Sequence, residues 1–200
     1  IQALAVLREQ KACGAIIKRF ENEDEKLTAI AAMVAIGHMP PLLEAVNGPS
    51  LQIRMGAITA LRRMANPESI PILVAAMNGA DVDERENIVR SLSAIGIEAY
   101  PHLIVALGDQ SKRVQLAALQ GLTLVRSERL MHKLIEMANS DDADVRLAVI
   151  DAMQRFSDGR VVAPLAAALD DGDPRVAKQA QRSIDYLESV VASKGTSSDQ

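Results

Sequence analysis

Residues 142–153 read DADVRLAVIDAM, and about thirty positions later residues 171–184 read DGDPRVAKQAQRSI. Each stretch starts with aspartates, joins a valine to an arginine, and continues into an alanine-containing run that ends on an apolar residue. The equivalent apolar residue, called the anchor here, recurs every 28 to 31 positions: Leu4, Met33, Leu61, Leu92, Leu122, Met153 and Ile184. Such a regular period indicates a repeat protein, in which each unit buries its apolar face against its neighbours.

The columns next to the anchor describe one buried face of a helix. Three positions before it, the first six units have apolar residues: Ile1, Ile30, Ile58, Val89, Leu119 and Ile150. One position before it, every unit has a small residue: Ala3, Ala32, Ala60, Ser91, Gly121, Ala152 and Ser183. Apolar residues three apart form a stripe along a helix, and small residues beside the stripe allow another helix to approach closely.

The start of this helix is marked by a capping residue. Eleven positions before the anchor, six units have a side chain that can accept a hydrogen bond from a first-turn N–H group: Asn22, Ser50, Asp81, Ser111, Asp142 and Asp173. Glu25 and Glu84 follow three positions later and would complete capping boxes, and Pro174 stands where a first helical residue tolerates proline. We call the helices that begin here the capped helices.

A second apolar segment in each unit predicts a second helix. It begins near Pro41, Pro71, Pro101 and Pro164, and it closes at Gly48, Gly79, Gly108 and Asn139, residue types that tolerate the left-handed conformation of a helix end. Two helices of roughly a dozen residues and two short turns would fill a unit of this length. The expected fold class is therefore all-α: an α-solenoid of antiparallel helix pairs.

The proline-started helix, the acidic turn, the valine–arginine pair and the alanine-rich helix resemble HEAT repeats, in particular the short HEAT-like repeats named after phycobilisome lyases. The resemblance covers Ile1 to about Val190. It implies a ladder between units, made by an aspartate of the turn and an arginine of the following helix. The arginine column reads Arg54, Arg85, Gln115, Arg146 and Ala177. The match is partial, so we expect an interrupted ladder.

The same alignment predicts the domain limits. One solenoid domain is expected over residues 1–192, followed by a polar tail over residues 193–200 that we expect to be disordered or extended. Ile1 aligns with Ile30, which stands in the middle of a capped helix, so the first repeat is expected to be truncated at its N-terminus. Its exposed apolar end would be covered by missing upstream repeats or by another subunit.

Composition narrows the function classes. The 200 residues are 48% hydrophobic but only 2% aromatic, and the net charge is −4. Nucleic acid is not an expected partner, because an acidic chain offers no general surface for a polyanion. No apolar run is long enough to span a bilayer, so neither a membrane partner nor a membrane location is expected. The single cysteine excludes an internal disulfide framework, and a cytoplasmic location is expected.

No catalytic or metal-binding motif is found. Deoxyhypusine hydroxylase, a HEAT-repeat metalloenzyme, depends on His-Glu pairs, whereas His38, His102 and His132 precede other residue types. Two histidines without a carboxylate cluster make a poor metal site, so no metal and no other cofactor is expected. Cys13 has no histidine near it in the sequence to act as a base, and a small buried residue is the expected role.

Two functions remain open. The first is a non-catalytic scaffold that binds a protein partner on its concave face, as solenoids commonly do. The alternative is implied by the resemblance alone: a phycobilin lyase-like protein, or a lyase subunit, that handles a bilin chromophore on a phycobiliprotein. The scarcity of aromatic residues argues mildly against that alternative, because only Phe20, Phe156, Tyr100 and Tyr186 could stack on a tetrapyrrole.

The resemblance also implies which surface binds. In HEAT repeats the helices after the acidic turn line the concave side. In this sequence the outward-facing columns of the equivalent helices carry arginines in the later units. We expect an acidic protein segment to bind there, because arginine and tyrosine are frequent at binding hot spots. The predicted binding residues are Arg62, Arg63, Arg90, Arg155, Arg182 and Tyr186.

Overall fold

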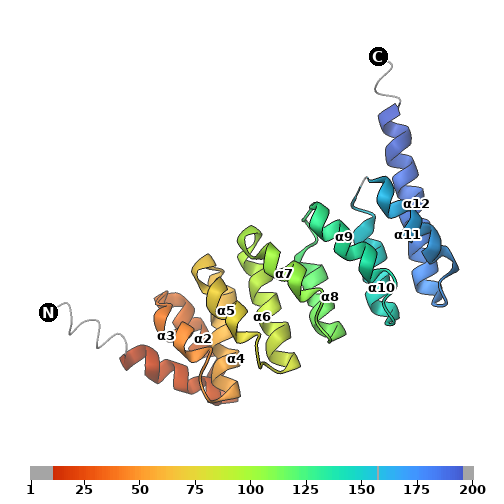
Figure 1. Cartoon of the computed structure of the whole chain (residues 1–200). Coiled ribbons are helices and arrows are strands. Elements are labelled where there is room, and N and C mark those ends of the chain that lie inside the picture. Colours follow the sequence, from red (N-terminus) through yellow and green to blue (C-terminus); the bar gives the residue numbers. More distant parts are fainter. Residues whose placement is uncertain (1–10, 157, 196–200) are drawn as a thin grey trace. The chain divides into compact units, whose positions relative to one another are not determined.

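The computed structural model describes residues 11–156 and 158–195, and every regular element within these ranges is a helix (Figure 1). The chain divides into two compact units, residues 1–106 and 107–200. Each unit is a stack of helix pairs, so the predicted all-α solenoid fold is confirmed. The apolar face predicted for Ile1, Leu4 and Leu7 lies outside the described residues.

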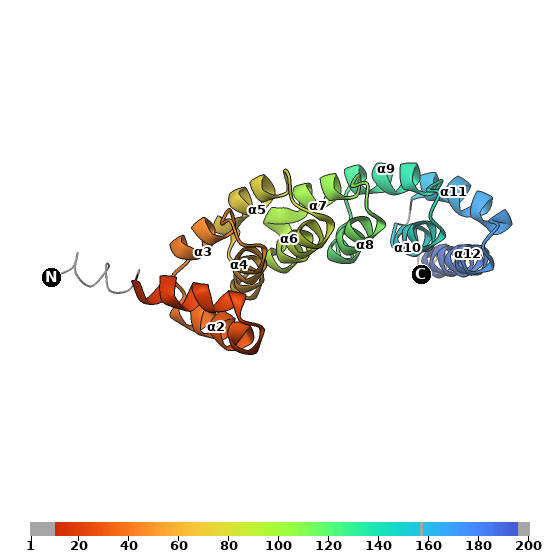
Figure 2. The same cartoon turned by 90° about the horizontal axis from the view of Figure 1, so that it is seen from below.

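The first unit has its helices in two layers (Figure 2). One layer holds the capped helices: α2 (Glu23–Ile36), α4 (Leu51–Met64) and α6 (Val82–Ile95). The other layer holds the second helix of each repeat: α3 (Pro40–Ala45), α5 (Ile70–Ala76) and α7 (Tyr100–Ala106). Residues 11–18 are also helical, and three 3-10 turns connect elements: η1 (Arg19–Glu21), η2 (Pro67–Ser69) and η3 (Ile97–Ala99).

The second unit repeats the arrangement. Its capped helices are α8 (Lys112–Gly121), α10 (Ala143–Met153) and α12 (Pro174–Gly195), and its second helices are α9 (Glu128–Met137) and α11 (Val162–Ala167). The 3-10 turns η4 (Gly159–Val161) and η5 (Ala168–Asp170) flank α11. Helix α12 continues through residues 193–195, the first three of the predicted tail, and residues 196–200 lie outside the described residues.

The anchor column forms the core, as predicted. Met33, Leu61, Leu92, Leu122 and Met153 are each no more than 3% exposed. Ile184, in the last repeat, is half-buried. These apolar side chains bury the stripe of each capped helix against its neighbours, and this burial is the main stabilising contribution in the fold.

The predicted capping residues begin the capped helices. Five of the six accept a hydrogen bond from a first-turn N–H group: Asn22, Ser50, Asp81, Asp142 and Asp173. Ser111 occupies the N-cap of α8, but its side chain makes no capping bond. The capping box predicted at Glu84 is present, whereas Glu25 pairs with Arg19 at 3.1 Å instead.

The second helices are shorter than predicted. They contain six to ten residues rather than about a dozen, because three of them are preceded by a 3-10 turn that takes up part of the apolar segment. A second difference lies at the end of α4, where Ala65 adopts a left-handed conformation with φ of 49°. Glycine normally holds such a position, so Ala65 carries local backbone strain.

Candidate functional site

The arginines predicted as a binding surface in the first unit lie on α4 and α6. Arg63 and Arg90 are exposed, whereas Arg62 is half-buried and donates from Nη1 to Oδ1 of Asn87 at 3.2 Å. Burial lowers the pKa of Arg62 below its usual value, and the charges of Arg90 and Arg63 lower it further. Arg63 and Arg90 therefore both lie close enough to Arg62 to repel its charge, and we call the three guanidinium groups the arginine cluster.

Part of the charge of the arginine cluster is neutralised within α6. Arg90 donates from Nε and Nη2 to Oε1 of Glu86, four residues earlier, at 3.1 and 2.8 Å. Glu86 stands outside the columns next to the anchor from which the binding residues were predicted. The spacing of four residues could have revealed the pair.

Asn87 positions Arg62 and was not among the residues predicted from the sequence. Its buried amide accepts from Arg62 and donates from Nδ2 to Oγ1 of Thr59 at 3.2 Å and to the carbonyl oxygen of Met55 at 3.4 Å. These bonds tie α6 to α4. Asn87 stands in a column where α4 and α8 have Gly56 and Ala117, so a polar residue among small ones was the available signal.

The predicted residues of the second unit lie on α12 and in the turn that follows α10. Arg155 is half-buried and pairs with Asp151 at 3.0 Å, four residues earlier. Arg182 and Tyr186 are exposed and stand four residues apart on α12, which places them on one face of that helix. Tyr186 is 49% exposed, so both its ring and the Arg182 guanidinium are accessible to a partner.

Arg54 and Arg146, two members of the arginine column, each contact the next repeat of their own unit. Arg54 donates from Nε to Oε1 of Glu84 at 2.6 Å, and Arg146 binds both carboxylate oxygens of Asp171 at 2.7 and 2.8 Å. The Arg146 guanidinium holds the pKa of Asp171 below its usual value. The ladder acceptor in the first unit is thus the capping-box glutamate rather than a turn aspartate.

Gln115 replaces an arginine of this column but keeps one of its bonds. The Arg54 and Arg146 side chains donate to the carbonyl oxygen six residues earlier, at 3.0 and 2.8 Å. Gln115 makes the same bond from Nε2 to the backbone carbonyl oxygen of Asp109 at 2.7 Å. The column therefore fixes the turn before each of these capped helices, even where the arginine is absent.

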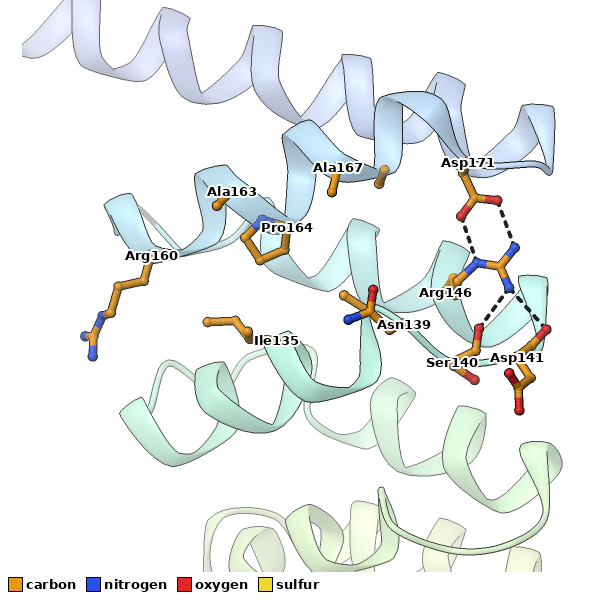
Figure 3. A pocket seen from close by; sticks show the side chains of 12 residues that line it. Ile135, Asn139, Ser140, Asp141, Arg146, Arg160, Ala163, Pro164, Ala167 and Asp171 are labelled. Atoms are coloured by element: carbon orange, nitrogen blue, oxygen red, sulfur yellow. Dashed lines mark hydrogen bonds and ion pairs between the residues drawn. The ribbon is translucent and has the colours of Figure 1, made fainter.

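A groove of about 740 Å³ lies between α9 and α11 in the second unit (Figure 3). Its sides include Ile135 and Ala138 near the end of α9, and Ala163 and Ala167 on α11. Asp141, Arg146 and Asp171 stand at one end, and Arg160 at the other. The second helices were predicted only as packing elements, and this groove was not predicted.

Arg160 joins the start of α9 to the turn before α11. It donates to both oxygens of Asp158, at 3.0 and 2.8 Å, and from Nη1 to Oε1 of Glu128 at 3.0 Å. These bonds lower the pKa of Asp158 to about 2. The exposed His132 ring lies 3.3 Å from the same guanidinium, so Arg160, which lines the groove, contacts three polar side chains.

Cys13 is fully buried, as predicted for a small core residue. Within residues 11–156 and 158–195, no group of three or more His, Cys, Asp or Glu side chains is placed to hold a metal ion. Among the same residues, no helix is both long and apolar enough to cross a membrane. Of the four aromatic residues weighed for a bilin, Phe20 and Phe156 are buried in the core.

Comparison with known proteins identifies the repeat. The sequence pattern of HEAT repeats matches residues 14–93 and 100–185, well over half of the chain. No curated protein matches the sequence. Among solved structures, an engineered protein is similar with a TM-score of 0.56 and 19% identity, covering 90% of each chain. A designed armadillo repeat protein in complex with the peptide (KR)4 has a TM-score of 0.57 and 16% identity, covering 89% of this chain and 92% of that one.

The complex of CpcE and CpcF of phycocyanin lyase from Nostoc sp. PCC7120 is also similar, with a TM-score of 0.44 and 19% identity over 90% of this chain and 82% of that one. A similarity this low carries no argument about function. The lyase alternative therefore stays a prediction of the sequence resemblance, and no feature of the site described above favours it.

Proposed function

The chain belongs to the HEAT repeat family, and on this premise we propose that it is a non-catalytic scaffold that binds an acidic segment of a partner protein. Stacked helix pairs present rows of side chains from successive repeats, an arrangement suited to holding an extended partner. The similar designed armadillo repeat protein is in complex with a peptide, and we carry over only this class of occupant.

The arginine cluster is the observation that supports an acidic occupant. Burial lowers the pKa of Arg62, and repulsion by Arg90 and Arg63 lowers it further, so like charges lie together on one layer of the first unit. A carboxylate placed between these guanidinium groups would relieve the repulsion and form charge-assisted hydrogen bonds. Arg62 is also held in place by Asn87, so less conformational entropy is lost when it binds a ligand.

The second unit, taken by itself, offers further residues for an acidic segment. Arg182 offers a second guanidinium, and Tyr186 offers an exposed ring with a polar tip four residues away. Arg155 is already paired with Asp151, so its contribution to binding a carboxylate is expected to be weaker. We expect the order of importance to be Arg62 and Arg63 first, then Arg90 and Arg182, then Arg155.

A peptide titration tests the proposal. The probe is a fluorescein-labelled peptide that alternates glutamate with small apolar residues, and its binding is followed by fluorescence anisotropy at low salt. The triple variant Arg62→Glu, Arg63→Glu, Arg90→Glu should bind it at least about tenfold more weakly, because attraction becomes repulsion. Raising the salt concentration from 0.02 to about 0.5 M should weaken binding to the wild type, since salt screens exposed charges.

The control changes the same charge elsewhere. The triple variant Lys18→Glu, Arg129→Glu, Lys178→Glu alters three exposed cations outside the arginine cluster and gives the same net charge. It should lose much less affinity than the cluster variant. Equal losses in the two triple variants would show that only net charge matters, and the arginine cluster would then not be the binding site.

A further inference from the structure

Helix α11 is apolar on all sides although much of it is exposed. Residues 161–169 read VVAPLAAAL and contain no polar side chain. Only Val161 and Leu165 are buried in the core, whereas Val162 is 52% exposed and Ala163 and Ala167 are exposed. A helix that is apolar all round is normally buried, and an exposed apolar patch marks an interaction site.

The groove beside α11 has the dimensions of a binding site. Its volume of about 740 Å³ lies within the range of roughly 300–1,000 Å³ that is typical of ligand-binding clefts. Ala138, Ala163 and Ala167 project only methyl groups into it, which leaves room for side chains of an occupant. Between two helices there is no row of unpaired backbone groups to hold an extended chain, so an occupant whose backbone is already hydrogen-bonded fits better.

In the part of the chain that the structure describes, one end of the groove carries carboxylates that have no cationic partner, whereas Arg160 at the other end is paired with Asp158 and Glu128. The Arg146 guanidinium binds the carboxylate of Asp171 and the backbone carbonyl oxygens of Ser140 and Asp141 (Figure 3). It therefore neutralises the Asp171 carboxylate but not the Asp141 carboxylate. Within the described residues, the exposed carboxylates of Asp141 and Asp170 form no ion pair. Helices α9 and α11 both end next to these residues, and the negative ends of their dipoles add to the same field.

We propose that the groove between α9 and α11 binds a short amphipathic helix of a partner protein, with small apolar residues on Ala163 and Ala167 and a lysine or arginine beside Asp141. The proposal does not rest on the arginine cluster, because the groove lies between second helices and the cluster lies on capped helices. The occupant expected here is basic, whereas the occupant expected at the arginine cluster is acidic. The two sites can therefore be tested independently.

The test uses two fluorescein-labelled helical peptides that share an alanine–leucine face. One peptide carries lysines at one end, and the other carries glutamates at the same positions. The lysine peptide should bind the wild type more tightly, and Ala167→Glu should weaken this binding at least about tenfold by placing a charged side chain in the groove. Ala166→Glu is the matched control, because Ala166 is equally exposed on α11 but does not line the groove; it should change affinity by less than about twofold.

A charge reversal tests the orientation of the occupant. Asp141→Lys should weaken binding of the lysine peptide about fivefold and strengthen binding of the glutamate peptide. Circular dichroism should show that all three variants keep wild-type helix content, since the changed residues are exposed; if Ala167→Glu does not, Asp141→Lys alone decides.

Four outcomes would overturn the proposal. The first is failure of the lysine peptide to bind the wild type at about 1 mM, a level at which only very weak affinity is missed. The second is an equal loss of affinity for the lysine peptide in Ala167→Glu and Ala166→Glu. The third is an Asp141→Lys variant that prefers the lysine peptide over the glutamate peptide as strongly as the wild type does. The last is a wild-type dimer in sedimentation experiments that Ala167→Glu dissociates, because the occupant would then be a second copy of this chain.

Discussion

Replacing Gly56 with alanine should destabilise the first unit, although alanine is the better helix former. Gly56 lies inside α4, where the change to alanine alone would contribute about 1 kcal/mol of stability. A Cβ atom at this position would stand 2.4, 2.6 and 2.8 Å from Cδ2, Cγ and Cβ of Phe20. Phe20 is fully buried, and its Cβ cannot move away without its backbone.

The size of the effect follows from these two opposing contributions. Overpacking a core usually costs about 1–3 kcal/mol, and contacts this short favour the upper end of that range. The expected net loss is therefore about 2 kcal/mol in the free energy of unfolding. Adding Phe20→Leu, which shortens the side chain, should recover at least about 1 kcal/mol relative to the sum of the two single changes.

Urea unfolding followed by far-ultraviolet circular dichroism measures these differences. Gly14→Ala is the control: it lies in the helical residues 11–18, and no neighbouring atom would be within 4 Å of its new Cβ. This variant should gain about 0.5–1 kcal/mol, since only helix propensity changes. A Gly56→Ala protein as stable as the wild type, or more stable, would refute the packing argument.

Three further predictions concern other parts of the chain. Leu92→Asp places a carboxylate in the core and should cost about 4 kcal/mol or more, with visible loss of helix by circular dichroism, whereas Gln181→Glu on an exposed face should change stability by less than about 0.5 kcal/mol. Ala65→Gly should stabilise the protein by about 0.5–1 kcal/mol in the same urea assay, because glycine adopts the left-handed conformation without strain. The pKa of Asp158, followed by carboxyl NMR, should be about 2 in the wild type and should rise toward 3.8 in Arg160→Gln. Because the folded-state pKa is the lower one, this pair stabilises the fold above about pH 4, and its contribution is lost as the pH falls toward 2.

Local patterns predicted much of the fold. The anchor column and the capping residues depend on the 3.6-residue period and on the hydrogen bonding of a first turn, and both are visible within one repeat. The length of the second helices was overestimated, because an apolar segment can begin as a 3-10 turn as well as an α-helix. The left-handed Ala65 carried no signal in the sequence, since alanine is not a residue that such a conformation selects.

The candidate sites were harder to predict because they depend on pairs of residues far apart in the sequence. The arginines were found by aligning columns, but Asn87 holds Arg62 through a contact across 25 positions that no column shows. Glu86 and Asp151 lie only four residues from the arginines they neutralise, and a search for such pairs would have lowered the expected charge. The groove beside α11 depends on the spacing of two helices, which sequence alone does not give.

Glu84 has a consequence for how the repeats fold together. One of its carboxylate oxygens receives the backbone N–H of Asp81 and so closes the first turn of α6, while the other receives Arg54 from the preceding repeat. Nucleation of α6 and its docking on α4 therefore strengthen each other, which is the nearest-neighbour coupling that makes a linear array fold cooperatively. We expect these two repeats to exchange their amide hydrogens as a single cooperative unit, so that opening one of them exposes the other.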